Sequence, residues 1–299
     1  MADLLLLASA AIWGVAFYFQ KTAMAHVGPV LFLGMRALVA ALVLSVFAWL
    51  ERRRSGGERG EASLWRIGGL GGVAFLAAAL LQQIGIDRGS VINSGFLTSL
   101  YVVAVPLLVW LLYGRPPRPA VSAAVAMAFA GAWLLSGGTG GGLSEGDLLV
   151  AASALLWAGH VLLVGAAAGF GRPALFTCIQ FTVVAGLALP VALATEVVEV
   201  DRILAAWDSI LYVGVLSSAL SFWLMALALR RAPVAEATVL MSTETLFAAL
   251  VGYTLLGERP SLGGWIGGVL IFAAVLVVQT GAREPRNEGA NAAMASDGE

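Results

Sequence analysis

The sequence has 299 residues, of which 60% are hydrophobic and only 12% are charged, and its mean hydropathy is +0.91. No soluble domain of this length could bury so much apolar surface, so the composition predicts an all-α protein that crosses a lipid bilayer many times. The formal net charge of −1 excludes a basic field that would recruit nucleic acid. Cys178 is the single cysteine, which excludes an intramolecular disulfide and a Cys-ligated metal site. We expect no metal and no cofactor.

Ten apolar segments are separated by charged or turn-forming residues, and each is predicted to form one transmembrane helix. In chain order they cover residues 4–20, 30–50, 64–84, 90–113, 119–136, 147–165, 173–195, 209–229, 234–256 and 262–280. The first is expected to be a retained span and not a signal peptide, because no basic residue precedes it and it is rich in aromatic residues.

The basic residues between these segments predict the orientation in the inner (plasma) membrane. With a cytoplasmic N-terminus, the inside holds twelve arginines: Arg52, Arg53, Arg54, Arg59, Arg66, Arg115, Arg118, Arg172, Arg230, Arg231, Arg283 and Arg286. The outside then holds four basic residues: Lys21, Arg88, Arg202 and Arg259. This bias predicts that both termini are cytoplasmic, and the polar tail of residues 282–299 is expected to be disordered.

The two halves of the sequence resemble each other. At an offset of 144 residues, Trp13 matches Trp157, and the Pro-Val-Leu-Phe that begins at Pro29 matches the Pro-Ala-Leu-Phe that begins at Pro173. At an offset of 143, Tyr101 falls on Glu244, and other glycine and serine positions coincide as well. Near-constant offsets over so long a stretch indicate an internal repeat.

Each predicted repeat contains five helices, the first in residues 1–140 and the second in residues 145–281, and the glycine-rich stretch 137–142 marks the junction. Because five is odd, the halves are predicted to cross the bilayer in opposite directions. Inverted repeats of this kind are typical of secondary transporters, whose substrate cavity lies near mid-membrane between the repeats. We therefore expect a central cavity there.

Two charged side chains fall inside predicted spans. Glu244 lies in the middle of the ninth segment, where a charge costs roughly 2.5–3.5 kcal/mol on insertion scales. It is either a structural hydrogen-bonding group or a group that binds a substrate amine or carries a proton. Arg36, in the second segment, either extends toward the outer interface or attracts an anionic group such as a carboxylate. Its repeat mate Gln180 is also polar, so both halves place a hydrogen-bonding side chain at this depth.

Aromatic residues recur in corresponding segments of the two halves. Trp13 and Phe17 are one helical turn apart, and so are Trp157 and His160. Such residues face lipid, pack in the core or form a cavity wall. The repetition of the tryptophan in both halves favours the cavity wall. His160 is a candidate proton carrier, with a hydrogen-bonded structural histidine as the alternative.

A polar stripe runs from the third predicted helix into the fourth. It contains Gln83, Asn93, Thr98 and Tyr101, and two of these share a helical face with a serine. Serine and threonine often bond their own backbone and prove little by themselves. Together with the two amides, however, they indicate an aqueous path.

Glycine clusters in the sequence do not indicate a nucleotide site. Gly68–Gly72 follows no predicted strand, and Gly137–Gly142 is not followed by Lys-Ser/Thr. In the last segment, overlapping GxxxG patterns beginning at Gly263 and Gly264 predict close helix packing. That packing is either within the chain or across a homodimer.

Several of these motifs resemble the drug/metabolite transporter superfamily, and within it the EamA-type permeases of ten helices. The matching residues are Trp13-Gly14 with Lys21, Pro29 with Arg36, the Phe-Leu-Thr-Ser-Leu-Tyr of 96–101 with Pro106, and Glu244 with Gly257-Glu258-Arg259. The resemblance covers about residues 4–280. It implies a ten-helix basket around a central cavity, with the fifth and tenth helices peripheral, and relatives that move amino acids, other metabolites or toxic compounds, mostly outward.

The sequence departs from the family pattern at two places. Thr245 stands where a proline often follows the acid, so a proline kink at Glu244 is not expected. The first-half counterpart of Glu258 is Arg115, which predicts that Glu258 serves an interface in one half only.

We therefore expect a secondary-type transporter that exports small polar metabolites, with amino acids the leading class, by alternating access. A multidrug or lipophilic-compound exporter is the alternative. A membrane-embedded enzyme is disfavoured, because the sequence has two histidines, no acidic cluster and one cysteine inside a span, and a purely structural membrane protein would not need repeated polar stripes. The expected partners are the lipid bilayer and a small-molecule substrate.

Overall fold

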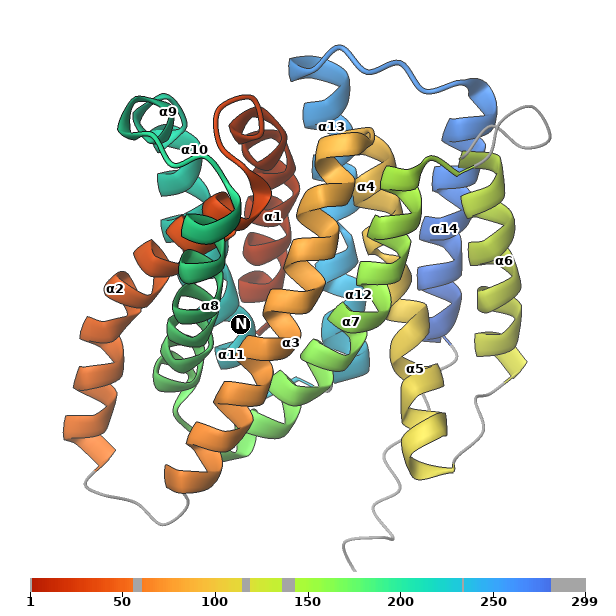
Figure 1. Cartoon of the computed structure of the whole chain (residues 1–299). Helices are drawn as coiled ribbons and strands as arrows, with labels where there is room; N and C mark the ends of the chain where they lie inside the picture. Colours follow the sequence, from red (N-terminus) through yellow and green to blue (C-terminus); the bar gives the residue numbers. More distant parts are fainter. Residues whose placement is uncertain (1, 56–60, 115–118, 136–142, 233, 281–299) are drawn as a thin grey trace, which may run out of the picture.

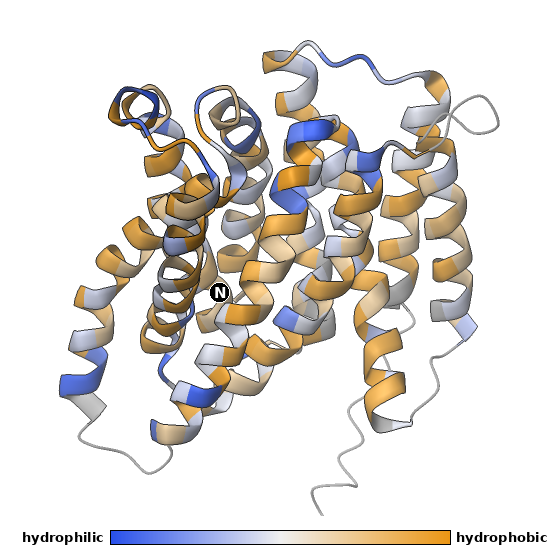
Figure 2. Cartoon of the chain, viewed as in Figure 1, coloured by the Kyte–Doolittle hydropathy of each residue, from blue (hydrophilic) through white to orange (hydrophobic). Residues whose placement is uncertain are grey.

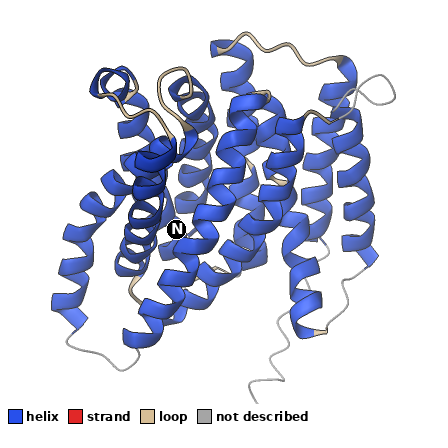
Figure 3. Cartoon of the chain, viewed as in Figure 1, coloured by secondary structure: helices blue, strands red, loops and turns tan. Residues whose placement is uncertain are grey.

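The computed structural model describes residues 2–55, 61–114, 119–135, 143–232 and 234–280, and this part of the chain consists of helices and short connections (Figures 1 and 3). The first half contains α1 (Ala2–Ala23), α2 (Pro29–Ser55), α3 (Glu61–Arg88), α4 (Val91–Thr98), α5 (Leu100–Tyr113) and α6 (Pro119–Leu135). The second half contains α7 (Glu145–Ala167), the 3₁₀ turn η2 (Ala168–Phe170), α8 (Pro173–Thr195), α9 (Val200–Ala205), α10 (Trp207–Leu211), the π-helix η3 (Tyr212–Leu220), α11 (Ser221–Ala228), α12 (Val234–Ser242), α13 (Glu244–Leu255) and α14 (Leu262–Thr280).

The lengths of the apolar helices identify a multi-pass membrane protein. In the described residues, seven segments are long and apolar enough to cross a bilayer, with α4 and α5 forming one and α10, η3 and α11 forming another. Three shorter apolar helices lie at Ser122–Leu135, Leu240–Leu255 and Leu262–Val277. Hydrophilic residues gather toward the two ends of the helices and hydrophobic residues between them (Figure 2). In their described residues, all ten predicted apolar segments are therefore helical, seven of them at full spanning length.

Helices of the two halves pack in matching pairs. α2 packs against α8 and α6 against α14, and these are the corresponding helices of the predicted repeats. α1 packs against α11, η3 and α13 of the second half, while α7 packs against α3, α4 and α5 of the first. Counterparts thus meet equivalent partners, and the main hydrophobic core is shared by both halves.

Two glutamates fix α2 and α8 side by side. Glu51, near the end of α2, accepts hydrogen bonds of 3.1 and 2.9 Å from two backbone N–H groups in the first turn of α8. Glu196, directly after α8, accepts bonds of 3.0 and 2.7 Å from two N–H groups in the first turn of α2. Each carboxylate satisfies free amides and meets the positive end of the helix dipole. The end of each helix therefore lies at the start of the other, and the pair is antiparallel.

Two spans are interrupted at equivalent points. Ser99 separates α4 from α5 and Thr243 separates α12 from α13, and both have φ −61° and ψ −12°. Each hydroxyl donates to the carbonyl three residues earlier, at 2.7 Å for Ser99 and 2.6 Å for Thr243, a bond that bends helices. The breaks are 144 residues apart, whereas the left-handed glycines that follow these spans, Gly114 and Gly257, are 143 residues apart, which is the offset that pairs Glu244 with Tyr101. As expected from Thr245, no proline makes the break.

The glycines of the last helix pack within the chain. A Cβ atom on Gly267 would lie 2.5 Å from the carbonyl oxygen of Gly131 in α6, and one on Gly268 would lie 2.7 Å from the ring of Phe96. Of the two interpretations of the GxxxG pattern, contact inside the chain is thus the one observed for these two glycines. The glycine-rich junction at 137–142 and the tail at 282–299 lie outside the described residues.

Candidate functional site

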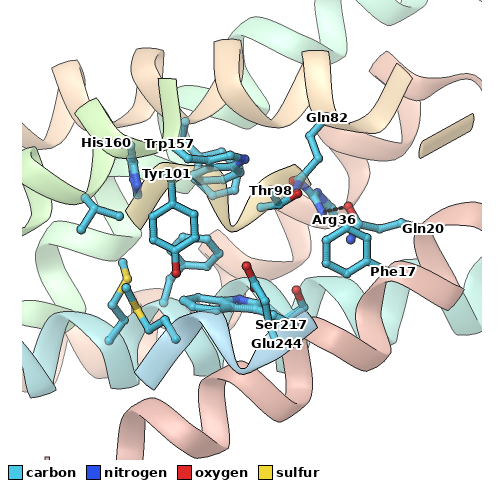
Figure 4. Close-up of a pocket in the computed structure, with 16 residues that line it drawn as sticks. Phe17, Gln20, Arg36, Gln82, Thr98, Tyr101, Trp157, His160, Ser217 and Glu244 are labelled. Carbon is cyan, nitrogen blue, oxygen red and sulfur yellow. Dashed lines mark hydrogen bonds between the residues drawn. The ribbon is translucent and has the colours of Figure 1, made fainter. Parts of the chain in front are cut away.

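A cavity lies between the two halves, lined by residues of α1 to α5, α7 and η3 to α13 (Figure 4). Its volume is about 60 Å³, room for about four water molecules at roughly 15 Å³ each. The lining residues are Trp13, Phe17, Gln20, Arg36, Phe75, Gln82, Thr98, Tyr101, Trp157, His160, Val161, Ser217, Phe222, Met225, Met241 and Glu244. Both halves therefore contribute polar and aromatic groups to one small space.

Arg36 supplies a positive charge to this cavity. Its Nη1 donates to Gln20 Oε1 at 3.2 Å, and its guanidinium carbon lies 5.8 Å from the ring centroids of both Phe32 and Phe75. Its Nε has no acceptor, and no carboxylate of the described residues lies within 4 Å. Only 4% of the residue is exposed. A buried guanidinium with free donors is suited to bind an anionic oxygen.

Glu244 places a carboxyl group at the helix break. It is the first residue of α13, 5% exposed, and its side chain points into the cavity (Figure 4). Within the described chain, no hydrogen bond or ion pair reaches its carboxylate. The break places this group at a helix N-terminus, where the dipole favours negative charge. Arg36 and Glu244 do not pair with each other.

Aromatic rings form the rest of the wall. The Phe75 ring packs at 5.1 Å from Trp157 and 5.0 Å from Phe222, with ring planes at steep angles. Trp13 packs 4.8 Å from Phe222 and donates its Nε1 hydrogen to the carbonyl of Ser217, at 2.9 Å. Ser217 belongs to the π-helix η3, a helix type that often marks functional sites. Trp157 Nε1 is buried without a partner and is a further available donor.

His160 lines the cavity and is hydrogen-bonded to a residue outside the lining. Its Nε2 lies 2.6 Å from Gln180 Oε1, while its Nδ1 has no partner. Because an amide oxygen only accepts, Nε2 carries the hydrogen of this bond. Gln180 itself does not line the cavity, and it contacts the histidine from outside the lining.

Of the predicted site residues, eight line the cavity: Trp13, Phe17, Arg36, Thr98, Tyr101, Trp157, His160 and Glu244. Gln83 and Asn93, like Gln180, lie outside its lining. Gln83 donates to the backbone carbonyl of Gln20, at 3.0 Å, and Asn93 donates to Asp147 Oδ1, at 3.2 Å. Each amide thus bonds a residue of an adjoining helix and not the cavity. Gln83 joins α3 to α1, and Asn93 joins α4 to α7.

Half of the lining consists of residues that the sequence did not single out as site residues. Gln20 lies one residue before Lys21, and its polarity inside the first span was the available signal. Gln82 adjoins Gln83 and donates to Thr98 Oγ1 at 2.9 Å, so choosing between the two amides needed the rotation of α3. The apolar members, such as Phe75, Phe222 and Met241, carried no signal, since they resemble core residues.

The ends of the helices near the α1–α2 loop are joined by polar groups. Lys21 Nζ donates to three carbonyls at the end of α3, at 2.7 to 3.0 Å, and Arg88 pairs with Glu145. Within the described part of the chain, no three His, Cys, Asp or Glu side chains gather to hold a metal ion. The cavity, to which both halves contribute polar and aromatic groups, is the candidate site.

Comparisons with known proteins agree with this architecture. A protein of Archaeoglobus fulgidus described as an uncharacterized transporter is 28% identical over 280 residues, covering 93% of this chain and 85% of that protein. The uncharacterized transporter YwfM of Bacillus subtilis is 24% identical over 291 residues, covering 95% of each. A solved crystal structure shares the fold with a TM-score of 0.67 at 19% identity, covering 94% of this chain and 97% of that one.

The profile of the EamA-like transporter family matches the sequence twice, at residues 1–137 and 144–280. The two matches fall on the two halves whose helices pack in corresponding pairs. Together they span nearly all of the described residues. The chain belongs to the EamA-like transporter family, and it is a membrane transporter and not an enzyme.

Proposed function

We propose that this transporter exports small zwitterionic metabolites, with amino acids the leading class, by alternating access between two inverted five-helix repeats. The observation that carries the proposal is that Arg36 and Glu244 line the same small cavity and do not pair with each other. Two buried charges are costly. A ligand with a carboxylate for Arg36 and an ammonium for Glu244 would offset both costs at once.

The size of the cavity supports a small substrate. At about 60 Å³ it is well below the roughly 300–1,000 Å³ of drug-sized sites. Gln20, Gln82 and Thr98 add hydrogen-bonding groups beside Arg36. A substrate of a few heavy atoms with polar groups suits this lining.

Alternating access is supported by the placement of the cavity and the helix breaks. The lining comes from both halves, and the breaks at Ser99 and Thr243 lie next to lining residues. Interrupted helices at the junction of repeats are the usual site of substrate binding in secondary transporters. In this proposal the three shorter apolar helices also cross the bilayer, which gives ten spans. Export is the direction that the resemblance implies.

The test is efflux from proteoliposomes loaded with single labelled amino acids, for the wild-type protein and two variants, Arg36→Gln and Glu244→Gln. We expect at least a tenfold loss of efflux for either variant, because each leaves one charged group of the bound substrate without its partner in the cavity. Matched controls are Arg202→Gln and Glu199→Gln, an exposed pair outside the cavity. If both cavity variants transport as well as the wild type, the zwitterion site is wrong.

A second candidate, an exporter of lipophilic compounds, is favoured by the wall formed by Phe75, Trp157 and Phe222. It predicts efflux of lipophilic cations that the Arg36→Gln substitution does not change, together with no efflux of any amino acid. Repeating the assay with and without a pH gradient decides on coupling. If efflux is the same with and without the pH gradient, Glu244 and His160 are not proton carriers.

A further inference from the structure

A second hollow lies away from the central cavity, on the outer surface of α13 and α14. It is an open groove of about 440 Å³ lined almost entirely by apolar side chains, among them Leu250, Tyr253, Trp265, Val269 and Phe272. Leu250 and Val269 are 58% and 65% exposed, so the groove faces the surroundings of the helix bundle. Figure 1 shows the two helices joined by a loop at one end of the molecule. The groove is thus a lipid-facing feature.

The groove extends inward from the membrane interface. Trp265 and Phe272 are seven residues apart on α14, which is about 10 Å along a helix. One leaflet of the hydrocarbon core is about 15 Å deep. Tyr253 and Trp265 lie near the connecting loop with ring centroids 6.4 Å apart, and such aromatic residues mark the headgroup level. The groove therefore reaches most of the way through one leaflet.

A cation stands at the mouth of the groove. The Arg259 guanidinium lies 3.9 Å from the Tyr253 ring centroid, and its Nη1 donates to the carbonyls of Tyr253 and Glu258, at 2.7 and 2.9 Å. The Glu258 carboxylate is occupied elsewhere, because it accepts from Ser90 Oγ and from two amides at the start of α4. Among the described residues, no acid pairs with Arg259, and its Nε and Nη2 remain available to an incoming phosphate.

We propose that this groove is a binding site for a phospholipid, with an acyl chain between α13 and α14 and the headgroup phosphate on Arg259. The apolar length, the aromatic pair and the exposed guanidinium occur in the order in which a lipid presents tail, interface and phosphate. A second copy of the chain fits less well, because Gly267 and Gly268 are already used in contacts with α6 and α4. The bound lipid fills the space between α13, whose first residue is Glu244, and α14.

The experiment is native mass spectrometry of the full-length protein titrated with palmitoyl-oleoyl-phosphatidylglycerol in detergent. We expect one tightly retained lipid per chain. Arg259→Gln should weaken its apparent affinity about fivefold, the effect of one interfacial cation. Val269→Trp fills the groove and should abolish the retained lipid. The matched controls, Arg202→Gln and Val191→Trp, change an exposed arginine and an exposed valine elsewhere and should keep it.

Three results would overturn the proposal. The first is retention of the lipid by the Val269→Trp variant with unchanged affinity. The second is an equal loss of lipid from the variants and from their controls. The third is a dimer that dissociates when Val269 is replaced by tryptophan, because the groove would then bind a second copy of the chain. Glycerophosphoglycerol has the headgroup and no acyl chains, so a hundredfold excess should not displace the bound lipid. Displacement would show that the affinity comes from the phosphate contact alone and not from the groove.

Discussion

Gly14 determines how closely α1 approaches the helix that carries Glu244. A Cβ atom at this position would lie 2.5 Å from the carbonyl oxygen of Glu244 and 3.0 Å from the backbone nitrogen of Ala248. Both are backbone atoms, so a side chain cannot be accommodated by rotation. The Trp13-Gly14 pair therefore has two roles, because the tryptophan lines the cavity and the glycine lets α13 reach it.

Substitution of Gly14 by alanine should separate α1 from α13. Overpacking of this kind costs about 1–3 kcal/mol, so we expect a lower apparent melting temperature in detergent and reduced efflux. Gly186→Ala is the matched control, since nothing lies within 4 Å of a Cβ atom there. Equal melting temperatures for the two variants would show that the α1–α13 contact is not as tight as described.

At the scale of elements, the carboxylate caps define the pair α2 and α8. Glu51 and Glu196 perform the same task at opposite ends of the pair, which only an antiparallel arrangement permits. Glu258 performs a similar task for α4. This agrees with the expectation that Glu258 serves an interface. Its first-half counterpart, Arg115, lies outside the described residues.

The caps can be tested by Glu196→Gln and Glu51→Gln. Each substitution removes the charge that faces a helix N-terminus and weakens the hydrogen bonds to its amides, so each should destabilise the protein by about 1 kcal/mol. Since the caps lie at opposite ends of the helices, their effects should add in the double variant. Thermal unfolding measures both effects. Glu199→Gln, in an exposed pair with Arg202, should change stability by less than about 0.5 kcal/mol.

At the break before Glu244, the Thr243 hydroxyl donates to the Leu240 carbonyl, and we expect this bond to hold the break open. We expect Thr243→Val to remove the bond to the Leu240 carbonyl, to favour a continuous helix and to turn Glu244 away from the cavity. Efflux should fall severalfold while stability changes little. Thr254→Val removes a hydroxyl bond to the carbonyl four residues earlier, that of Leu250, near the end of α13 and should leave efflux unchanged. Equal efflux in both variants would mean that the break has another cause.

At the scale of the whole molecule, the distribution of basic residues predicts the orientation in the membrane. In a Cys178→Ser background, cysteines introduced at His26 and Asp201 should react with an impermeant maleimide added to intact cells. Cysteines at Arg53 and Gly169 should react only after the cells are opened. All four positions are exposed on connections or helix ends. If the cysteines at Arg53 and Gly169 were labelled in intact cells, the predicted orientation would be wrong.

The sequence by itself determined the class, the helices and the two halves of this protein. Hydropathy is a local property of the sequence, and the repeat is visible as a periodic offset. An apolar segment that crosses a bilayer forms a helix, because its backbone N–H and C=O groups find hydrogen-bond partners only within the segment. The charged residues Arg36 and Glu244 were identifiable for a related reason, since a charge in an apolar run is rare and costly.

The tertiary structure decided which neighbours these residues have. Gln82 lines the cavity and Gln83 does not, because the rotation of α3 against α1 is fixed by packing across the bundle. The same holds for Phe75 and Phe222, whose identity as wall residues depends on contacts between helices distant in sequence. Periodicity assigns a residue to a helix face, but only the packed bundle decides what that face meets.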